Sequence, residues 1–151
     1  MFQSLDQVLT HAQHLHMNGC VPKGSWNLAQ TCHHLTCWMT YPVEGFPPQP
    51  WFVRLMLGAM RLTVGKRILT GILATGKMRP NTPTTPETVA PPNLDVDKAI
   101  QNLRRAIQTF TRHNGPIHPS PLFGAMDKET ALRLQLVHAA HHFANLAPAP
   151  G

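Results

Sequence analysis

Apolar residues recur at the period of an α-helix in four segments of the chain, whereas no segment shows the alternation that marks a half-buried strand. In one of these segments Ala99, Leu103 and Ile107 fall on the same side of a helix. An amphipathic helix has to bury that side against other elements. The sequence therefore predicts an all-α fold, an up-down four-helix bundle, with helices over residues 4–17, 26–40, 97–112 and 128–146.

Local signals mark the helix ends. Ser4 and Gln7 have the spacing of a capping box, and Ser25 is the expected N-cap of the second helix. That helix is expected to end at Tyr41, because the residue before Pro42 is disfavoured in the α conformation.

The acidic residues are few, 7 in all, and most lie at expected helix starts, where a carboxylate caps free N–H groups or complements the helix dipole. Only Glu44 and Glu87 lie in connecting segments. No acidic pair has a spacing that would point two carboxylates inward from a helix, which disfavours a ferritin-like di-iron site and a two-carboxylate glycosidase. The acids at helix starts are Asp6, Asp95, Asp97, Asp127 and Glu129.

The second and third helices are joined by residues 42–96, a connection that has to cross the bundle. Residues 51–62 have a helical pattern, and residues 79–93 hold five prolines and are predicted to be an extended loop. The prediction is a long Pro-rich crossover with one short extra helix. Three glycines that follow this helix are expected to interrupt any longer one. They are Gly65, Gly71 and Gly76.

The length of 151 residues predicts a single domain, residues 1–147, followed by a disordered tail, residues 148–151. No stretch of about 18 apolar residues is free of charge, so no spanning helix is expected. The N-terminal sequence lacks the pattern of a signal peptide, and 3 cysteines are an odd number for a disulfide framework. We therefore expect a cytoplasmic location.

The formal net charge is +6, which suits anionic partners, although a soluble surface with few acids is the favoured explanation. Residues 51–77 combine apolar and basic side chains. Packing of this segment on the bundle, or on a second copy in a homodimer, is favoured over contact with a membrane surface. Nucleic-acid binding is disfavoured, because basic charge is not accompanied by a helix-turn-helix, a zinc finger or a set of aromatic platforms.

Histidine is unusually frequent, with 10 residues, and two of them have a spacing that suits a metal. His138 and His142 are four residues apart, so they stack on one face of the last helix. A third imidazole could come from His33 or His34 on the second helix. Three neutral imidazoles leave coordination positions open for water or substrate, as in catalytic sites. From spacing alone, a partly exposed polar edge is favoured over a metal site.

Other sites are disfavoured. No glutamate follows His138 in the HExxH position, so the sequence does not support the HExxH mechanism of metalloproteases. Cys32 and Cys37 lie mid-helix and are expected to be small core residues rather than zinc ligands. The loop with His118 could line the mouth of a pocket or simply connect two helices.

The segments WNLAQTCHHLTCW and HPSPLFGAMDKETALRLQLVHAAHHFANL resemble the DinB-like (YfiT-like) metalloenzyme superfamily, and in particular an uncharacterised family within it. The resemblance covers essentially the whole chain. It implies a four-helix bundle with a mononuclear three-histidine metal site. On this sequence the implied ligands are His34, His138 and His142. His33 and His141 would then orient a ligand or exchange a proton near neutral pH.

The resemblance implies a divalent transition metal, zinc, nickel, iron or manganese, that activates water or a small thiol. The expected function is hydrolysis or thiol-dependent transfer on a small-molecule substrate. The alternative is a non-catalytic helical bundle that binds a small ligand or a protein partner.

Overall fold

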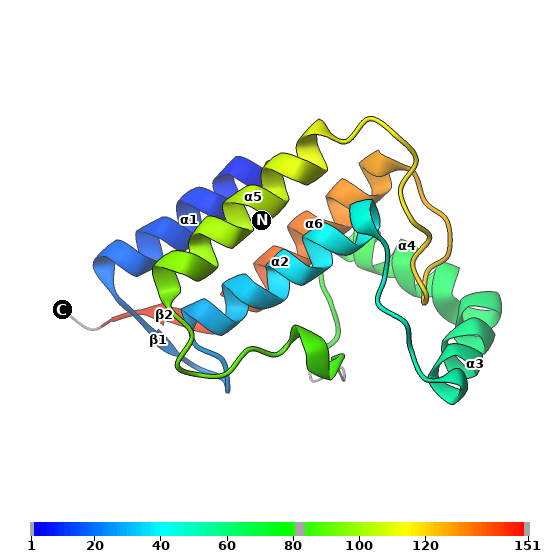
Figure 1. Cartoon of the computed structure of the whole chain (residues 1–151), viewed down its shortest axis with the longest axis horizontal. Helices are drawn as coiled ribbons and strands as arrows, with labels where there is room; N and C mark the ends of the chain where they lie inside the picture. The colour runs from blue at the N-terminus through cyan, green and yellow to red at the C-terminus, as the bar shows by residue number, and fades with distance from the viewer. Residues whose placement is uncertain (1, 81–83, 150–151) are drawn as a thin grey trace.

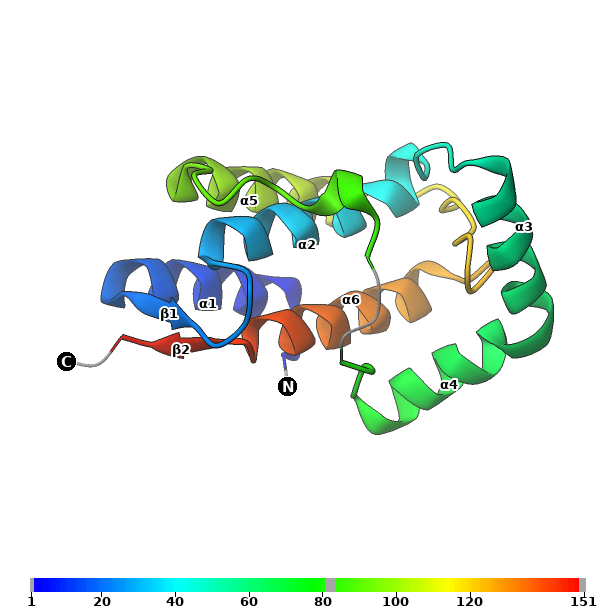
Figure 2. The same ribbon diagram turned by 90° about the horizontal axis from the view of Figure 1, so that it is seen from below.

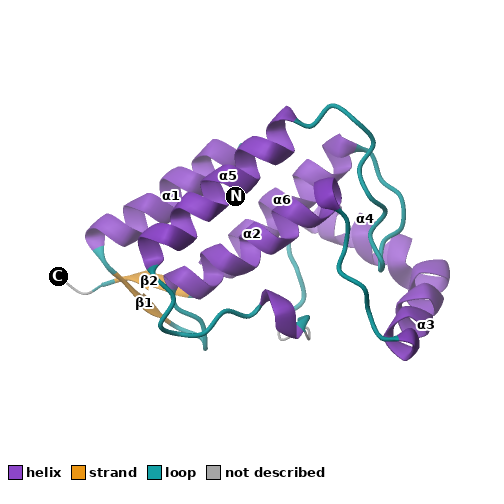
Figure 3. Cartoon of the chain, viewed as in Figure 1, coloured by secondary structure: helices purple, strands orange, loops and turns teal. Residues whose placement is uncertain are grey.

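Helices carry nearly all of the regular structure in the computed structural model, which describes residues 2–80 and 84–149 (Figure 1, Figure 3). In chain order the elements are α1 (Leu5–Asn18), β1 (Cys20–Pro22), α2 (Leu28–Glu44), α3 (Trp51–Met60), the π-helical turn η1 (Arg61–Gly65), α4 (Lys66–Thr75), the 3₁₀ turn η2 (Pro86–Thr88), α5 (Val96–Arg112), α6 (Lys128–Phe143) and β2 (Leu146–Pro148). The all-α prediction is confirmed.

Helices α1, α2, α5 and α6 enclose one hydrophobic core, into which each turns the apolar side expected from its sequence. Val8 of α1, Leu35 of α2, Leu103 of α5 and Phe143 of α6 are all buried there. Burying one such large apolar side chain contributes about 1.5–3 kcal/mol to the free energy of unfolding. This shared core fixes α2 relative to α6.

The four core helices do not alternate strictly in direction. Within the pair α1 and α2 and within the pair α5 and α6 the helices run antiparallel, whereas α2 and α5 run parallel and pack side by side (Figure 1, Figure 2). Parallel neighbours cannot be joined by a short turn. The long crossover between α2 and α5 is therefore a consequence of this packing.

Helix α2 starts later than predicted. Asn27, not Ser25, is the N-cap, and it forms a capping box in which its side chain accepts from the Gln30 N–H at 3.0 Å and the Gln30 side chain accepts from the Asn27 N–H at 3.1 Å. Two otherwise unpaired N–H groups are satisfied in this way, which stabilises the helix start.

The predicted end of α2 at Tyr41 is wrong, because the helix continues through Pro42 to Glu44. Proline has no N–H for the carbonyl four residues earlier, here that of Trp38. Gln135 of α6 supplies the missing donor: its side-chain Nε2 donates to the Trp38 carbonyl oxygen at 2.6 Å. A tertiary hydrogen bond thus replaces the one that Pro42 removes.

The crossover holds two helices rather than the one short helix expected. Gly65 and Gly71 do not interrupt it, because α3 runs through the π-helical turn η1 directly into α4. Gly65 lies against the 117–124 loop, where a Cβ atom would collide with the carbonyl oxygen of Leu122. Only Gly76 acts as predicted, ending α4 in the left-handed conformation with a φ of 63°.

The Pro-rich segment after α4 is largely extended, as predicted, but contains η2; residues 81–83 lie outside the described residues. Hydrogen bonds fasten this segment to α2. Gln30 Nε2 donates to the Ala90 carbonyl at 2.8 Å, and Asn27 Nδ2 donates to the Pro92 carbonyl at 2.8 Å. The segment therefore lies along the start of α2.

Carboxylate caps act as the sequence predicts at two helices. Asp95 accepts from the Lys98 N–H at the start of α5, and Asp127 accepts from the Thr130 N–H at the start of α6, each at 2.7 Å. The Thr130 N–H also holds the pKa of Asp127 below its usual value. Ser4 caps α1 as expected.

A small antiparallel sheet, which no sequence pattern predicted, joins β1 to β2. Each strand has only three residues, too few to show a periodic pattern. Helix α6 therefore ends at Phe143 and not at Leu146. The expected tail begins inside β2, where Pro148 pairs with Cys20; residues 150–151 lie outside the described residues.

Across the described ranges, 2–80 and 84–149, none of the helices combines the length and the hydropathy that crossing a bilayer requires.

Candidate metal centre

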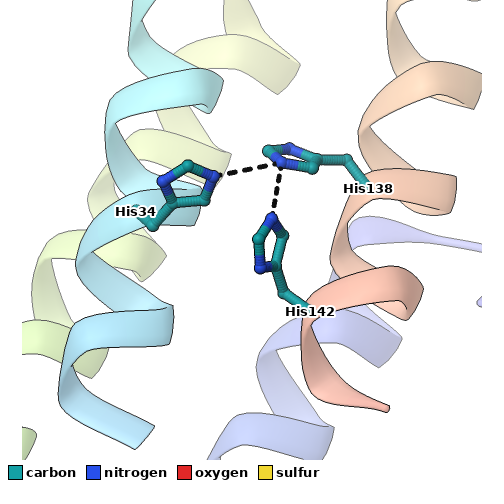
Figure 4. Close-up of side chains that lie close together, drawn as sticks. All are labelled: His34, His138 and His142. Carbon is teal, nitrogen blue, oxygen red and sulfur yellow. Dashed lines mark hydrogen bonds between the residues drawn. The ribbon is translucent and has the colours of Figure 1, made fainter. Parts of the chain in front are cut away.

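Three imidazole rings from two helices meet at one point (Figure 4). His34 projects from α2, and His138 and His142 project from successive turns of α6. The Nε2 atom of His138 lies 3.2 Å from Nε2 of His34 and 2.9 Å from Nε2 of His142. The structure thus brings together the pair with i, i+4 spacing and one histidine of the second helix.

The spacing of these nitrogens fits a metal ion. One ligand nitrogen from each ring lies within 4.8 Å of the other two. Nitrogens bound to one tetrahedral zinc at about 2.0–2.1 Å lie about 3.3 Å apart. Among the described residues, no other group of three histidine, cysteine or acidic side chains meets this criterion. The three histidines could therefore hold a metal ion.

Thr88 fixes the tautomer of His34. The Thr88 hydroxyl donates to the Thr85 carbonyl at 2.8 Å, so its oxygen is left to accept from Nδ1–H of His34 at 3.0 Å. A neutral imidazole with its proton on Nδ1 has a lone pair on Nε2. That lone pair faces the other two histidines, as a metal ligand requires.

Three neutral imidazoles cannot form a good hydrogen bond at each of the two nitrogen contacts of His138. Nε2 of His138 carries either one proton or one lone pair, yet it makes two short contacts. If it carries the proton, that proton must be shared between His34 and His142. If it carries the lone pair, it faces the lone pair of His34. A cation between the rings would be attracted by all three nitrogens.

Burial keeps the three imidazoles uncharged. Removal from water, together with the neighbouring His142, lowers the pKa of His34 to about 3. Burial and His141 lower the pKa of His142 to about 4, and burial also lowers the pKa of His138. His138 is half-buried and lines a cavity. At neutral pH all three are in the form that binds metals.

A cavity of about 820 Å³ opens beside the three rings. Its lining is mainly apolar, which is typical of small-molecule sites. Trp26 stacks on His142 with ring centroids 5.4 Å apart and lies 4.8 Å from His34. Ile72 of α4 and Phe123 of the 117–124 loop also line the cavity. Helix α4 and the 117–124 loop thus form part of the cavity wall.

The structure separates the two remaining candidate histidines. His141 lines the cavity, with its ring 5.1 Å from that of His142, and burial lowers its pKa. His33 lies outside the lining, where its Nε2 is 3.6 Å from Sγ of Cys37. Of the two, His141 alone faces space that a substrate could occupy.

The sequence also singled out one loop histidine and two cysteines. His118 lines the cavity, which favours the pocket-mouth interpretation of its loop. Cys32 is fully buried in the core, and burial raises the pKa of its thiol to about 12. Cys37 is half-buried and free. Neither cysteine belongs to the three-histidine group.

Sequence reasoning missed Thr88. Its side chain contacts His34 from a segment 54 residues away in the chain, and no local pattern distinguishes it from the other threonines of the Pro-rich segment. Only the docking of that segment on α2 reveals the contact.

The model of one protein family, described as "Protein of unknown function (DUF1569)", matches residues 1–149. The chain belongs to the DUF1569 family. No curated protein and no solved structure is significantly similar to it. The three histidines, Thr88 and the cavity all lie within the part of the chain that the DUF1569 model covers.

Proposed function

We propose that this DUF1569 chain is a metal-dependent enzyme of the DinB-like type, a four-helix bundle in a single domain. It would use His34, His138 and His142 as ligands of one divalent transition metal. The observation that carries the proposal is the convergence of three neutral imidazoles on one point in the wall of a cavity. The resemblance of the two histidine-containing segments to the DinB-like superfamily supports it independently.

A divalent metal on three imidazoles would act as a Lewis acid and lower the pKa of a water or thiol that reaches it. The protein supplies the rest of the chemistry. Thr88 orients His34 through Nδ1, and the ring of Trp26 shields His142. The lowered pKa of His141 keeps its imidazole neutral, so it can accept a proton from a group bound in the cavity.

Because the cavity is mainly apolar, we expect a small substrate with a substantial apolar part. Hydrolysis and thiol-dependent transfer are the two reaction classes that fit a nucleophile of lowered pKa. We place the protein in the cytoplasm.

The first experiment is metal analysis of protein purified without a histidine tag. We expect about one equivalent of metal per chain, bound directly or after addition of zinc, nickel, manganese or iron. The double variant His138→Ala, His142→Ala should lose it. The double variant His14→Ala, His113→Ala, which changes one exposed and one half-buried histidine outside the three-histidine group, should keep it. Less than about a tenth of an equivalent in the unaltered protein would refute the metal site.

An open coordination position distinguishes an enzyme from a merely structural site. In the Co²⁺-substituted protein, a small thiol or azide should change the visible spectrum at a saturable concentration. A spectrum that does not respond to either ligand would favour a closed, structural metal site in a bundle without catalytic activity.

A further inference from the structure

Apart from the cavity, the molecule has a surface on which large apolar side chains are exposed. Of the ten large hydrophobic side chains that are exposed among the described residues, seven belong to α3, η1 and the start of α4. We call these seven the 51–68 face. They are Trp51, Phe52, Leu55, Met56, Leu62, Val64 and Ile68, of which Ile68 also lines the cavity beside the three histidines.

On α3, the members of the 51–68 face lie on the side of the helix that does not pack against the rest of the protein. On α3 its members have the i, i+1, i+4, i+5 spacing of one helix side, and the side chain of Trp51 is 76% exposed. On the other side of α3, Val53, Leu57 and Met60 are half-buried toward the rest of the protein. Apolar residues therefore cover both sides of α3, and only one side is used by the fold.

The helix that carries this face stands apart from the core. No residue of α3 is buried, whereas α4 packs against α6. In two perpendicular views α3 lies at one end of the molecule, far from β1 and β2 (Figure 1, Figure 2). Exposed apolar surfaces of this kind mark contacts with proteins or with membranes.

Charge distinguishes between these occupants. Residues 45–86 contain six basic side chains and no acidic one. The nearest acids in sequence are Glu44 and Glu87, and Glu87 accepts a hydrogen bond from Gln49 at 2.9 Å, close to the start of α3. The six basic residues are Arg54, Arg61, Lys66, Arg67, Lys77 and Arg79.

We propose that the 51–68 face binds the surface of an anionic lipid bilayer. An apolar helix side with exposed tryptophan and phenylalanine, next to arginine and lysine, is the pattern of a helix that lies in a membrane interface. Each basic residue near an anionic surface strengthens binding. A second copy of the chain fits less well, because pairing of two segments that each contain six basic residues and no acidic one would bring like charges together.

Co-sedimentation with vesicles tests the proposal. Binding should be strong to vesicles of phosphatidylcholine with phosphatidylglycerol, weak to phosphatidylcholine alone, and reduced by salt. The double variant Phe52→Ser, Leu55→Ser should lower the partition coefficient by at least about tenfold, and Arg54→Gln by about fivefold. Met17→Ser is the matched control, because Met17 is as exposed as Trp51 but lies on α1, near the end that carries β1, and it should leave binding unchanged.

Tryptophan fluorescence locates the contact. Brominated lipids should quench part of the emission, and Trp51→Phe should remove the quenched part while the variant still sediments with vesicles. Equal sedimentation of the Phe52→Ser, Leu55→Ser variant and the unaltered protein would overturn the proposal. So would a dimer in solution that this variant converts to monomer, since the face would then be an interface between copies. The metal content of these variants should stay unchanged, which separates this test from that of the metal site.

Discussion

The hydroxyl of Thr88 accepts a hydrogen bond from Nδ1 of His34 at 3.0 Å and thereby turns the Nε2 lone pair of His34 toward His138 and His142. The hydroxyl is itself held by the Thr85 carbonyl, and Thr88 is completely buried. A loop residue thus determines the tautomer of a candidate metal ligand on α2.

Replacing Thr88 should weaken metal binding without removing a ligand. We expect Thr88→Val to lower the affinity for zinc by about 10–100-fold, because His34 loses the acceptor that orients it. Thr88→Ser keeps the hydroxyl and should restore most of the affinity. Competition with a chromophoric chelator measures the affinity, and ¹⁵N chemical shifts of the imidazole report the tautomer of His34.

Thr40→Val serves as a control, since the Thr40 hydroxyl donates only to the Thr36 carbonyl of its own helix. An unchanged His34 tautomer in Thr88→Val would show that Thr88 has a structural role alone.

The stability of the metal-free protein should fall as the pH falls from about 6.5 toward 4. Burial lowers the pKa of His34 to about 3 and that of His142 to about 4, so in this window the unfolded chain binds more protons than the folded chain. Each such proton lowers the free energy of unfolding by about 1.4 kcal/mol per pH unit.

Urea denaturation at a series of pH values measures this slope. His142→Gln should make the slope shallower by about one proton. A slope that is the same in His142→Gln and in the unaltered protein would contradict the burial of a neutral imidazole at position 142.

The contribution of Gln135 to the free energy of unfolding should depend on the presence of Pro42. Gln135→Leu leaves the Trp38 carbonyl without its donor and should cost about 1–3 kcal/mol of unfolding free energy. In a Pro42→Ala background the backbone N–H at position 42 can bond to that carbonyl, so Gln135→Leu should cost less. A double-mutant cycle by chemical denaturation gives the difference. Equal costs in the two backgrounds would mean that Gln135 acts only through its packing.

Two glycines of the crossover should respond to alanine in opposite directions. Gly65→Ala should destabilise the protein by about 1–3 kcal/mol, because its Cβ would collide with the Leu122 carbonyl oxygen. Gly71→Ala meets open space in the middle of α4 and should stabilise it by about 0.5–1 kcal/mol. Thermal unfolding measures both. Equal effects of the two changes would show that η1 does not dock on the 117–124 loop as the structure has it.

The sequence by itself determined the helices of the core and the pairing of two of the three histidines in the candidate site. Helical periodicity places Leu103 and Phe143 in the core, because an apolar stripe has to be buried wherever the helix packs. The i, i+4 spacing likewise brings His138 and His142 onto one face of α6, because helix geometry depends on local backbone angles alone.

Only the tertiary structure decided the contacts between distant segments. Helix geometry alone leaves His33 and His34 as equal candidates, and only the resemblance to the DinB-like superfamily favoured His34. In the structure, the packing of α2 against α6 turns His34 toward the pair. Pro42 reads locally as a helix stop, yet a donor from α6 lets the helix continue. Thr88 reaches His34 only because the crossover lies along α2. Such contacts depend on how separate helices and loops meet in space, and no short-range pattern in the chain encodes that.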